Sequence, residues 1–422
     1  MTPVPLVIER PVAGGRMLAR LDGRVVFVAG AIPGEQVRVR ITRETKSALW
    51  GDVVEVLTPS EDRRAPACDA ACGGLAYAHI QYERQTALKR AVVADAFHRL
   101  AKIDLDPAPE ITPSPERGYR LRARLHVRGH HVGFFRAGTH DICDPEPTGQ
   151  LLPEGLAGVA RATAALASRA AECGAIVIAE NIAATERVLH FEPREGARLD
   201  DLARRLALPA GVTGITTEVR GRIVPIAGST TVTDTATALF GDQSPIGALP
   251  AWSRKASSFF QGNRFLMGAL VTRVLELAPG NRFLDLYSGV GLFAVALAAQ
   301  GASGAAVEGD RSSGSDLDAN AAPWRGRLQV VHSSVEAFLT RSIDPLPDVV
   351  VLDPPRTGVS ADALSALLKW TVPRVVYVSC DPPTLARDAA RFLGAGYALR
   401  SIAAFDLFPN TPHVEVVAEF AK

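Results

Sequence analysis

The stretch with the clearest chemical potential is Val375 to Asp388, with the sequence Val-Val-Tyr-Val-Ser-Cys-Asp-Pro-Pro-Thr-Leu-Ala-Arg-Asp. Its β-branched and aromatic start predicts a buried strand, and Cys380 stands where that strand must stop. Two prolines follow, and they cannot extend a strand because they have no backbone N–H to donate. Thr384 to Phe392 then predicts a helix, with Thr384 as its N-cap.

A thiol at the carboxyl end of a strand lies where open α/β sheets bind their ligands. A helix N-terminus close to Cys380 would favour the thiolate form. The alternative is that Cys380 is a small buried hydrophobic residue, which is the commoner fate of a lone cysteine. The rest of the chain has to decide between these interpretations.

A second strand ends in a similar way. Asp348 to Leu352 is an apolar run, and Asp353-Pro354-Pro355-Arg356 follows it directly. A rigid turn with a surface aspartate would show the same residues. Because Cys380 ends the next predicted strand, however, we expect a carboxylate and a thiol to face one crevice.

The sequence Asp285-Leu-Tyr-Ser-Gly289-Val-Gly291 lies between a predicted strand and a predicted helix. Glycines at such a turn let the backbone approach a bound cofactor closely. Glu308 ends the next strand, which suits a carboxylate that binds ribose hydroxyls. Ala294 replaces the third glycine of the dinucleotide fingerprint, and this favours a nucleoside cofactor without phosphates. Taken alone the signal is weak, since any tight strand-to-helix turn would show these glycines.

The elements around these residues predict an α/β chain of three domains. Five short strands punctuated by glycine predict a small closed β-barrel of the oligonucleotide-binding (OB) kind in residues 1–60, and an ordinary structural barrel is equally compatible with the spacing. Residues 61–250 mix helices and strands and predict a middle α+β domain, which we expect to contact RNA. From residue 251 to 422, strands and helices alternate and end in an antiparallel pair. This pattern predicts a Rossmann-like, doubly wound catalytic domain with a hairpin at one edge.

A basic strand is predicted between Arg117 and Arg136. Arginines and a histidine alternate there with apolar residues, so one face is cationic and the other apolar, and aromatic residues flank the run. This suits phosphate contacts with bases stacked nearby. The alternative, an edge strand made cationic against aggregation, is equally compatible with the pattern. Tyr82 to Leu100 predicts a helix with lysine and arginine on its outer face.

Composition narrows the cellular setting. The net charge is +1, so an anionic partner has to be bound by a local patch. The five cysteines are odd in number, and no apolar signal-type segment or membrane-length apolar run is present. We therefore expect a soluble protein of a reducing cytoplasm, without membrane association and with no protein partner implied.

Taken together, the motifs resemble the S-adenosylmethionine-dependent RNA uracil-5-methyltransferases, which often carry a TRAM barrel. The resemblance spans 257–422 and is weaker over the barrel. The matching segments, in order, are Phe259-Phe-Gln261-Gly-Asn263, Asp285 to Gly291, Val307-Glu308-Gly309, Ala319-Asn320-Ala321, Asp353 to Arg356, Tyr377 to Asp388 and Phe408-Pro-Asn-Thr-Pro-His-Val-Glu415.

The resemblance implies a methyl transfer from S-adenosylmethionine to carbon 5 of a uridine in transfer or ribosomal RNA. It makes Cys380 the nucleophile that attacks carbon 6, and Glu415 the base that removes the carbon 5 proton. It also implies a set of cofactor-binding residues, namely Gln261, Tyr287, Gly289, Glu308 and Asp353. The rival functions are a cytosine-5 RNA methyltransferase and an RNA-binding protein that lost turnover on the same scaffold.

The chain departs from the family pattern at one cofactor site. Many relatives hold an iron–sulfur cluster through a Cys-x5-Cys-Gly-Gly-Cys run and a later fourth cysteine. Here only Cys68 and Cys72 are present in that run, Leu75 takes the third position and Thr148 the fourth. Two ligands cannot hold a four-iron cluster, so the sequence predicts that the cluster is absent and that the protein binds no metal.

Overall fold

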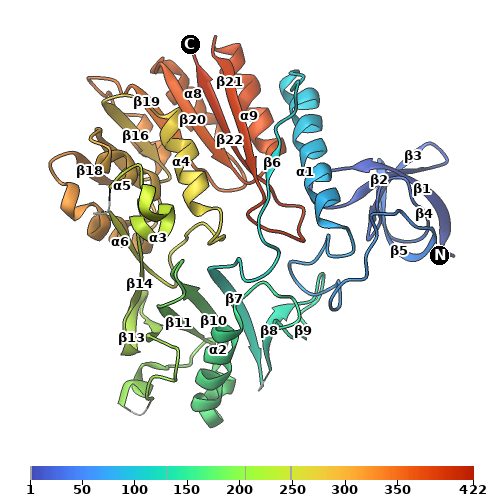
Figure 1. Cartoon of the computed structure of the whole chain (residues 1–422), viewed down its shortest axis with the longest axis horizontal. Coiled ribbons are helices and arrows are strands. Elements are labelled where there is room, and N and C mark those ends of the chain that lie inside the picture. Colours follow the sequence, from blue (N-terminus) through green and yellow to red (C-terminus); the bar gives the residue numbers. More distant parts are fainter. Residues whose placement is uncertain (1, 130, 205, 248–249) are drawn as a thin grey trace.

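The structure is a computed structural model that describes residues 2–129, 131–204, 206–247 and 250–422. Figure 1 shows three groups of elements: a blue barrel at one end, a green sheet below, and an orange and red sheet with its helices above. Helix α1 stands between the barrel and the red C-terminal strands.

The N-terminal barrel forms as predicted. Its strands close in the order β1-β2-β3-β5-β4. They are β1 Val4–Pro11, β2 Met17–Leu21, β3 Arg24–Ala29, β4 Gln36–Glu44 and β5 Ala48–Thr58. Alternate residues face inward, and Tyr77 and Ile80 from the following linker join the same core. The barrel is thus packed on the segment that leads into α1.

The second sheet has seven strands in the order β13-β12-β11-β10-β7-β8-β9. They are β7 Arg122–Arg128, β8 His131–Phe135, β9 Ile142–Cys143, β10 Cys173–Glu180, β11 Arg187–Pro193, β12 Gly214–Val219 and β13 Arg222–Gly228. Helix α2 (Pro153–Leu166) and the 3-10 turn Ala167–Glu172 that follows it belong to this unit. The predicted basic strand is β7, and it pairs with β10 on one side and β8 on the other. The edge-strand interpretation was therefore wrong.

The third sheet has eight strands in the order β18-β17-β16-β19-β20-β22-β21-β6. Its parallel part is β16 Arg282–Leu286, β17 Ser303–Glu308, β18 Leu328–His332, β19 Val349–Leu352 and β20 Arg374–Ser379. The chain ends with the predicted antiparallel pair, β21 Ala398–Phe405 and β22 Glu415–Ala421. The outermost strand of this edge is β6 (Ile111–Thr112), which the sequence did not predict in this sheet.

Both faces of the eight-stranded sheet are covered, as the apolar strands require. Alternate residues of one strand serve opposite faces: Val349 and Val351 belong to one apolar cluster, and Val350 and Leu352 to the other. The first cluster contains residues of α4, α5 and α6, and the second contains residues of α7, α8 and α9. These helices are α4 Met267–Leu277, α5 Leu292–Ala299, α6 Arg311–Ala321, α7 Val335–Leu339, α8 Ala361–Lys369 and α9 Pro382–Gly394.

Helix α1 (Tyr82–Ala96) continues as a π-helical turn, Phe97–Ala101, and packs against the helices on one face of the eight-stranded sheet. The prediction that its lysine lies on the outer face was wrong. Lys89 is fully buried because its ammonium pairs with Asp406 of the C-terminal segment. The segment 82–112, which the sequence placed in the middle domain, thus lies against the third sheet.

A small ribbon links the two larger sheets. Strand β14 (Thr231–Thr235) pairs antiparallel with β15 (Ala251–Lys255), and the short helix α3 (Ala236–Phe240) follows β14. The ribbon joins the two sides of the domain boundary expected at residue 250. The three-domain division stays a prediction about folding units.

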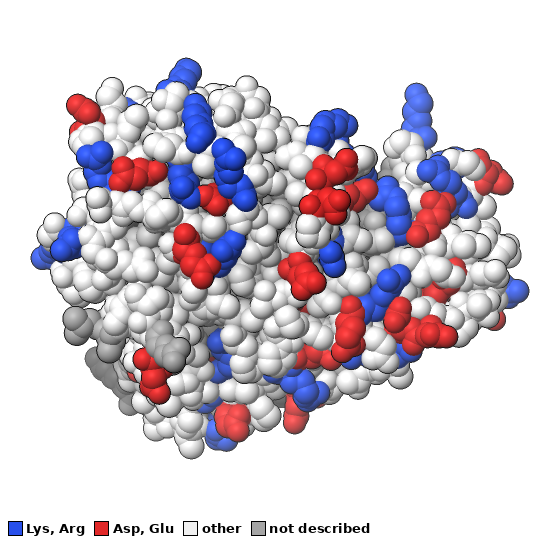
Figure 2. Space-filling model, turned by 45° about the horizontal axis from the view of Figure 1, so that its top comes forward, with Lys and Arg blue, Asp and Glu red and all other residues white. Residues whose placement is uncertain are grey.

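The visible surface carries interspersed charges. On the face in Figure 2, lysine and arginine side chains alternate with aspartate and glutamate, which agrees with the net charge of +1. Over the described part of the chain, no helix has both the length and the apolar character needed to span a bilayer.

Candidate active site

Cys380 lies directly after β20, where the sequence placed it. The helix that follows begins at Pro382, and its N-cap is Asp381, whose Oδ1 accepts the backbone N–H of Thr384 at 2.9 Å. The prediction of Thr384 as the N-cap was wrong by three residues, because the two prolines lie inside the first helical turn and not before it. The chain reversal leaves the thiol at the carboxyl edge of the sheet.

The strand order brings the predicted carboxylates to the same edge. β19 and β20 are parallel neighbours, so Asp353 and Cys380 follow two adjacent strand ends. β22 runs antiparallel beside β20, with Val416 opposite Ser379, so Glu415 starts its strand at this edge. Asp353, Cys380 and Glu415 therefore lie close together at one edge of the sheet.

Burial at this edge of the sheet favours the neutral forms of Cys380 and Glu415. Burial raises the pKa of the Cys380 thiol to about 11, with a further rise from the charge of Glu415. The guanidinium of Arg356 acts in the opposite direction, through its charge and a hydrogen bond to the thiol. Burial likewise raises the pKa of Glu415, and the charge of Asp353 adds to that rise. Contrary to the expectation of a thiolate, burial thus raises the pKa of the thiol, although the helix that begins at Pro382 lies close by.

The turn after β16 is built around positive backbone angles. Tyr287 has φ of 63°, and Gly289 and Gly291 have φ of 57° and 89°. A Cβ added to Gly289 would have no other atom within 4 Å, so the space next to this part of the backbone is open. Glu308 Oε2 accepts the Gly289 N–H at 2.8 Å, which joins the ends of β16 and β17. Three of the predicted cofactor residues are therefore brought together here.

The other two predicted cofactor residues lie on the same side. Gln261 Nε2 donates to Asp353 Oδ2 at 3.1 Å. Beside them Asp285 is fully buried, and its Oδ1 has no hydrogen-bond partner among the described residues. Burial, with the charge of Asp353, raises the pKa of Asp285 to about 8. A cationic ligand would relieve both the unpaired oxygen and the repulsion, so these residues fit the ammonium and sulfonium of S-adenosylmethionine.

The structure adds two residues that the sequence analysis did not assign. Arg356 ends the Asp-Pro-Pro-Arg motif and is the cation nearest the thiol, and its Nη2 lies 3.3 Å from His413 Nε2. Burial and the charge of Arg356 lower the pKa of His413 to about 4, so its ring is neutral. Both residues lie within motifs that carry the family resemblance, and this was the signal in the sequence that could have identified them.

Strand β7 contributes to the site differently than predicted. Arg122 is largely buried and donates from Nε to the Ala256 carbonyl at 2.8 Å, three residues before Phe259. Arg124 pairs with Glu192 of β11, across the intervening β10. Arg122 thus anchors the segment that carries Gln261, and only part of the predicted cationic face remains for a ligand.

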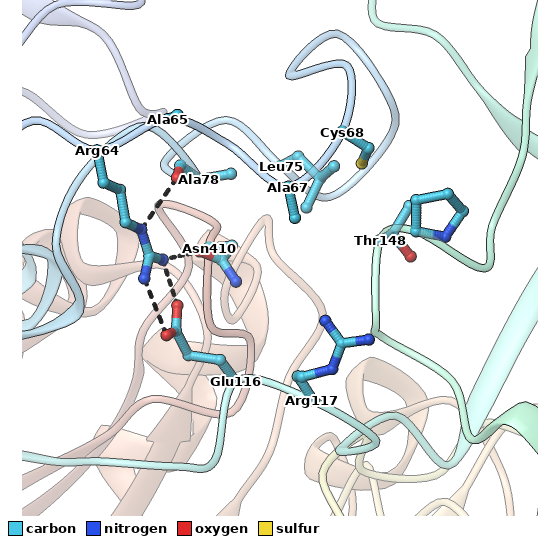
Figure 3. A pocket seen from close by; sticks show the side chains of 11 residues that line it. Arg64, Ala65, Ala67, Cys68, Leu75, Ala78, Glu116, Arg117, Thr148 and Asn410 are labelled. Atoms are coloured by element: carbon cyan, nitrogen blue, oxygen red, sulfur yellow. Dashed lines mark hydrogen bonds and ion pairs between the residues drawn. The ribbon is translucent and has the colours of Figure 1, made fainter.

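Cys68, Leu75 and Thr148 line one pocket of about 210 Å³ (Figure 3). Cys72 is bonded to Cys143 in a disulfide, with Cα atoms 5.8 Å apart. Cys68 is a free cysteine. Within the ranges that the structure describes, no group of three or more metal-binding side chains occurs. A four-iron cluster needs four thiolates, and these residues do not fit one.

Comparison with known proteins identifies the fold and the family. Residues 251–420 match the family described as tRNA (Uracil-5-)-methyltransferase, and residues 4–54 match the TRAM domain. The 23S rRNA (uracil(1939)-C(5))-methyltransferase of Halomonas elongata is 33% identical, over 97% of this chain and 88% of that protein. The chain belongs to the RNA uracil-5-methyltransferase family.

Two further proteins are similar to this chain over almost their whole length. An uncharacterized RNA methyltransferase of Streptomyces avermitilis is 34% identical, over 97% of this chain and 96% of that protein. The tRNA (uracil-54, C5)-methyltransferase of Pyrococcus abyssi, solved with S-adenosyl-L-homocysteine, has a TM-score of 0.74 at 24% identity and covers 99% of both chains. The family resemblance and the barrel-plus-methyltransferase fold predicted from sequence are confirmed.

The pKa of Cys380 gives a direct prediction. Alkylation of Cys380 by iodoacetamide should accelerate about tenfold per pH unit between pH 8 and pH 10, because the thiolate fraction grows in that proportion below the pKa. Arg356→Gln should slow the reaction at each pH, since it removes the cation that lowers the pKa. Mass spectrometry of the Cys380 peptide measures the rate, with Cys380→Ser as the control for assignment. A rate that does not change with pH would contradict the prediction.

Proposed function

We propose that this protein transfers a methyl group from S-adenosylmethionine to carbon 5 of a uridine in ribosomal or transfer RNA, in the cytoplasm. The observation that carries the proposal is the meeting of a thiol, two carboxylates and a guanidinium at the edge of the sheet. Family membership supports the reaction class.

The residue types match the difficulty of the reaction. Carbon 5 of uracil is a weak nucleophile, and S-adenosylmethionine supplies only an electrophilic methyl group. Attack by the Cys380 thiolate on carbon 6 forms an S–C6 bond and moves the ring electrons toward oxygen 4, so that carbon 5 becomes nucleophilic. Cys380 must first lose its proton, and Arg356 is placed to stabilise the resulting thiolate.

The last step releases the enzyme. Once carbon 5 carries the methyl group, the Glu415 carboxylate removes the remaining carbon 5 proton. The C–H electron pair becomes the C5–C6 double bond, and the S–C6 bond breaks with its electrons returning to sulfur. The raised pKa of Glu415 makes it a stronger base than an exposed glutamate, because its charge is less stable in the buried site.

We assign cofactor binding to Gln261, Tyr287, Gly289, Glu308 and Asp353, together with the buried Asp285. Glu308 is placed for ribose hydroxyls, since it closes the turn that contains Gly289. The acids near Asp285 are placed for the positive charges of the cofactor. The uridine must leave its base stack to reach this edge. The exposed Arg124 and Arg128 of β7 are a proposed RNA contact, whereas the flanking Tyr119 and Phe134 are buried and cannot stack on bases.

The main test is methyl transfer from labelled S-adenosylmethionine to unmodified ribosomal and transfer RNA, followed by nucleoside analysis. Wild type should yield 5-methyluridine, and Cys380→Ala should lower the yield below detection, because attack on carbon 6 has no nucleophile. If the label were found in 5-methylcytidine, the protein would instead be a cytosine-5 RNA methyltransferase. Cofactor binding without label in either RNA would favour the RNA-binding alternative.

Cofactor binding can be tested without RNA. Glu308→Ala should weaken the binding of S-adenosyl-L-homocysteine by about 10- to 100-fold, since hydrogen bonds to a charged group contribute roughly 1.5–3 kcal/mol. Isothermal titration calorimetry measures the dissociation constant. Asp318→Ala is the matched control, because Asp318 is an exposed acid of α6 that pairs with the exposed His332. Equal affinity of Glu308→Ala and wild type would contradict the assignment.

We also propose that the protein works without an iron–sulfur cluster. The purified protein should contain no stoichiometric iron by elemental analysis. After purification in air and unfolding without reductant, three thiols should titrate, because Cys72 and Cys143 are joined. With reductant the number should rise to five. Cys143→Ser, the control, should give four thiols in both conditions. A brown sample with stoichiometric iron would refute the proposal.

A further inference from the structure

The loop between β21 and β22, residues 406–414, leads directly into Glu415, and we call it the return loop. Glu415 is the first residue of β22, so the position of its backbone depends on how the return loop enters the strand. The return loop is held by side chains from residues 64 to 89, more than 300 positions earlier in the chain.

Helix α1 supplies the first set of contacts. Lys89 Nζ donates to Asp406 Oδ1 at 2.6 Å and to the Phe408 carbonyl at 3.2 Å. Both charged side chains of this pair are fully buried. Burial lowers the pKa of Lys89 and raises that of Asp406, so the pair contributes little net stability. Its contribution is geometric, because a buried charge must stay beside its partner.

One turn earlier on α1, Gln85 forms a reciprocal pair with Asn410. Gln85 Nε2 donates to Asn410 Oδ1 at 2.9 Å, and the Asn410 backbone N–H donates to Gln85 Oε1 at 2.9 Å. Gln85 is itself fixed, since its amide also donates to the carbonyls of Tyr77 and Ile80. The contact is therefore rigid on both sides.

The linker before α1 adds further contacts to the same residue. Tyr77 donates its backbone N–H to the Asn410 carbonyl at 2.8 Å, and Arg64 Nη2 donates to Asn410 Oδ1 at 2.8 Å. Figure 3 shows the Arg64 guanidinium held between Asn410, the Ala78 carbonyl and the Glu116 carboxylate. Asn410 has φ of 64°, a left-handed conformation that asparagine tolerates better than most residues.

Two more parts of the chain approach the return loop. Asn263, two residues after Gln261, donates to the Leu407 carbonyl at 3.0 Å. In the barrel, a Cβ on Gly15 would lie 2.8 Å from Pro412, so the backbone there is in close contact with the return loop. The return loop is thus the place where the barrel, the linker with α1 and the cofactor-binding segment meet.

We propose that Gln85, Lys89 and Asn410 are positioning residues for Glu415: by fixing the return loop they hold the carboxylate where it can remove the carbon 5 proton. This inference rests on the proposed function. The role of Glu415 divides the reaction into two stages. Attack by Cys380 and methyl transfer do not require Glu415, whereas proton removal and breakage of the S–C6 bond do. A return loop that shifts should therefore leave the enzyme joined to its RNA.

The experiment compares two RNA substrates in a denaturing gel that retains only covalent complexes. Unmodified transcripts of ribosomal and transfer RNA report on release, because a complex accumulates only when the proton stays on carbon 5. The same transcripts made with 5-fluorouridine report on attack and methyl transfer alone, because fluorine at carbon 5 cannot be removed as a proton. The Glu415→Gln variant, which lacks the base, shows how much covalent complex accumulates when the carbon 5 proton cannot be removed.

Asn410→Gly is the central variant, since it keeps the left-handed backbone and removes the side-chain hydrogen bonds. We expect it to trap 5-fluorouridine RNA within twofold of the wild-type rate. On ordinary RNA it should accumulate covalent complex and release 5-methyluridine product at least tenfold more slowly. Asn410→Asp keeps the acceptor oxygen toward Gln85 and Arg64, so it should restore release to within threefold of wild type.

Lys89→Gln should behave like Asn410→Gly, and Arg90→Gln is its control. Arg90 is the next residue of α1, and within the described residues it makes no hydrogen bond or ion pair to the return loop. Binding of S-adenosyl-L-homocysteine confirms that each variant is folded. Slow turnover of Asn410→Gly without covalent complex, or turnover equal to wild type, would overturn the positioning role while Glu415→Gln still accumulates complex. Failure of Glu415→Gln itself to accumulate complex would overturn the proposed mechanism and this inference with it.

Discussion

The burial of like charges at one edge of the eight-stranded sheet is the constraint on which the rest of this structure depends. Asp285 and Glu415 are buried together, and burial and the charge of Asp353 raise the pKa of both carboxyl groups. Burial also raises the pKa of Asp353, although the hydrogen bond from Gln261 acts in the opposite direction. Such an arrangement is unfavourable unless cations complete it. Arg356 supplies one, and the cofactor with its positive charges is proposed to supply the rest. The same burial raises the pKa of the Cys380 thiol.

This edge is assembled from distant parts of the chain, and each is fixed by buried polar contacts. Arg122 of the seven-stranded sheet binds the backbone just before Phe259, and Arg254 of β15 pairs with the buried Asp234 of β14. Helix α1 fixes the return loop through Lys89 and Gln85. Buried ion pairs of this kind add little stability, but a partner that moves away leaves an unpaired charge in an apolar interior. They are thus suited to hold three sheets in one relative position around the site.

Local sequence predicted the parts of the fold that local physics controls. The barrel strands, the alternation of strands and helices after residue 257, and the strand ends at Asp353 and Cys380 follow from side-chain periodicity and from proline. Predictions failed where a residue's surroundings came from elsewhere. Lys89 was expected in solvent because helical periodicity does not reveal an aspartate 317 positions away. The edge-strand interpretation of β7 failed because the sequence of a single strand does not show which strands pair with it.

The sequence by itself determined the chemistry that this protein can attempt: a cysteine and carboxylates at strand ends, and a glycine turn for a nucleoside cofactor. Covalent side-chain type and short-range backbone preferences are properties of the chain at each position, so they can be read without a fold. Only the tertiary structure decided that Glu415 faces Cys380, that Arg356 is the cation beside the thiol and that desolvation raises the pKa of that thiol. Those outcomes depend on which distant groups share a buried volume, and burial and Coulomb interactions are set by distances in space rather than by separation along the chain.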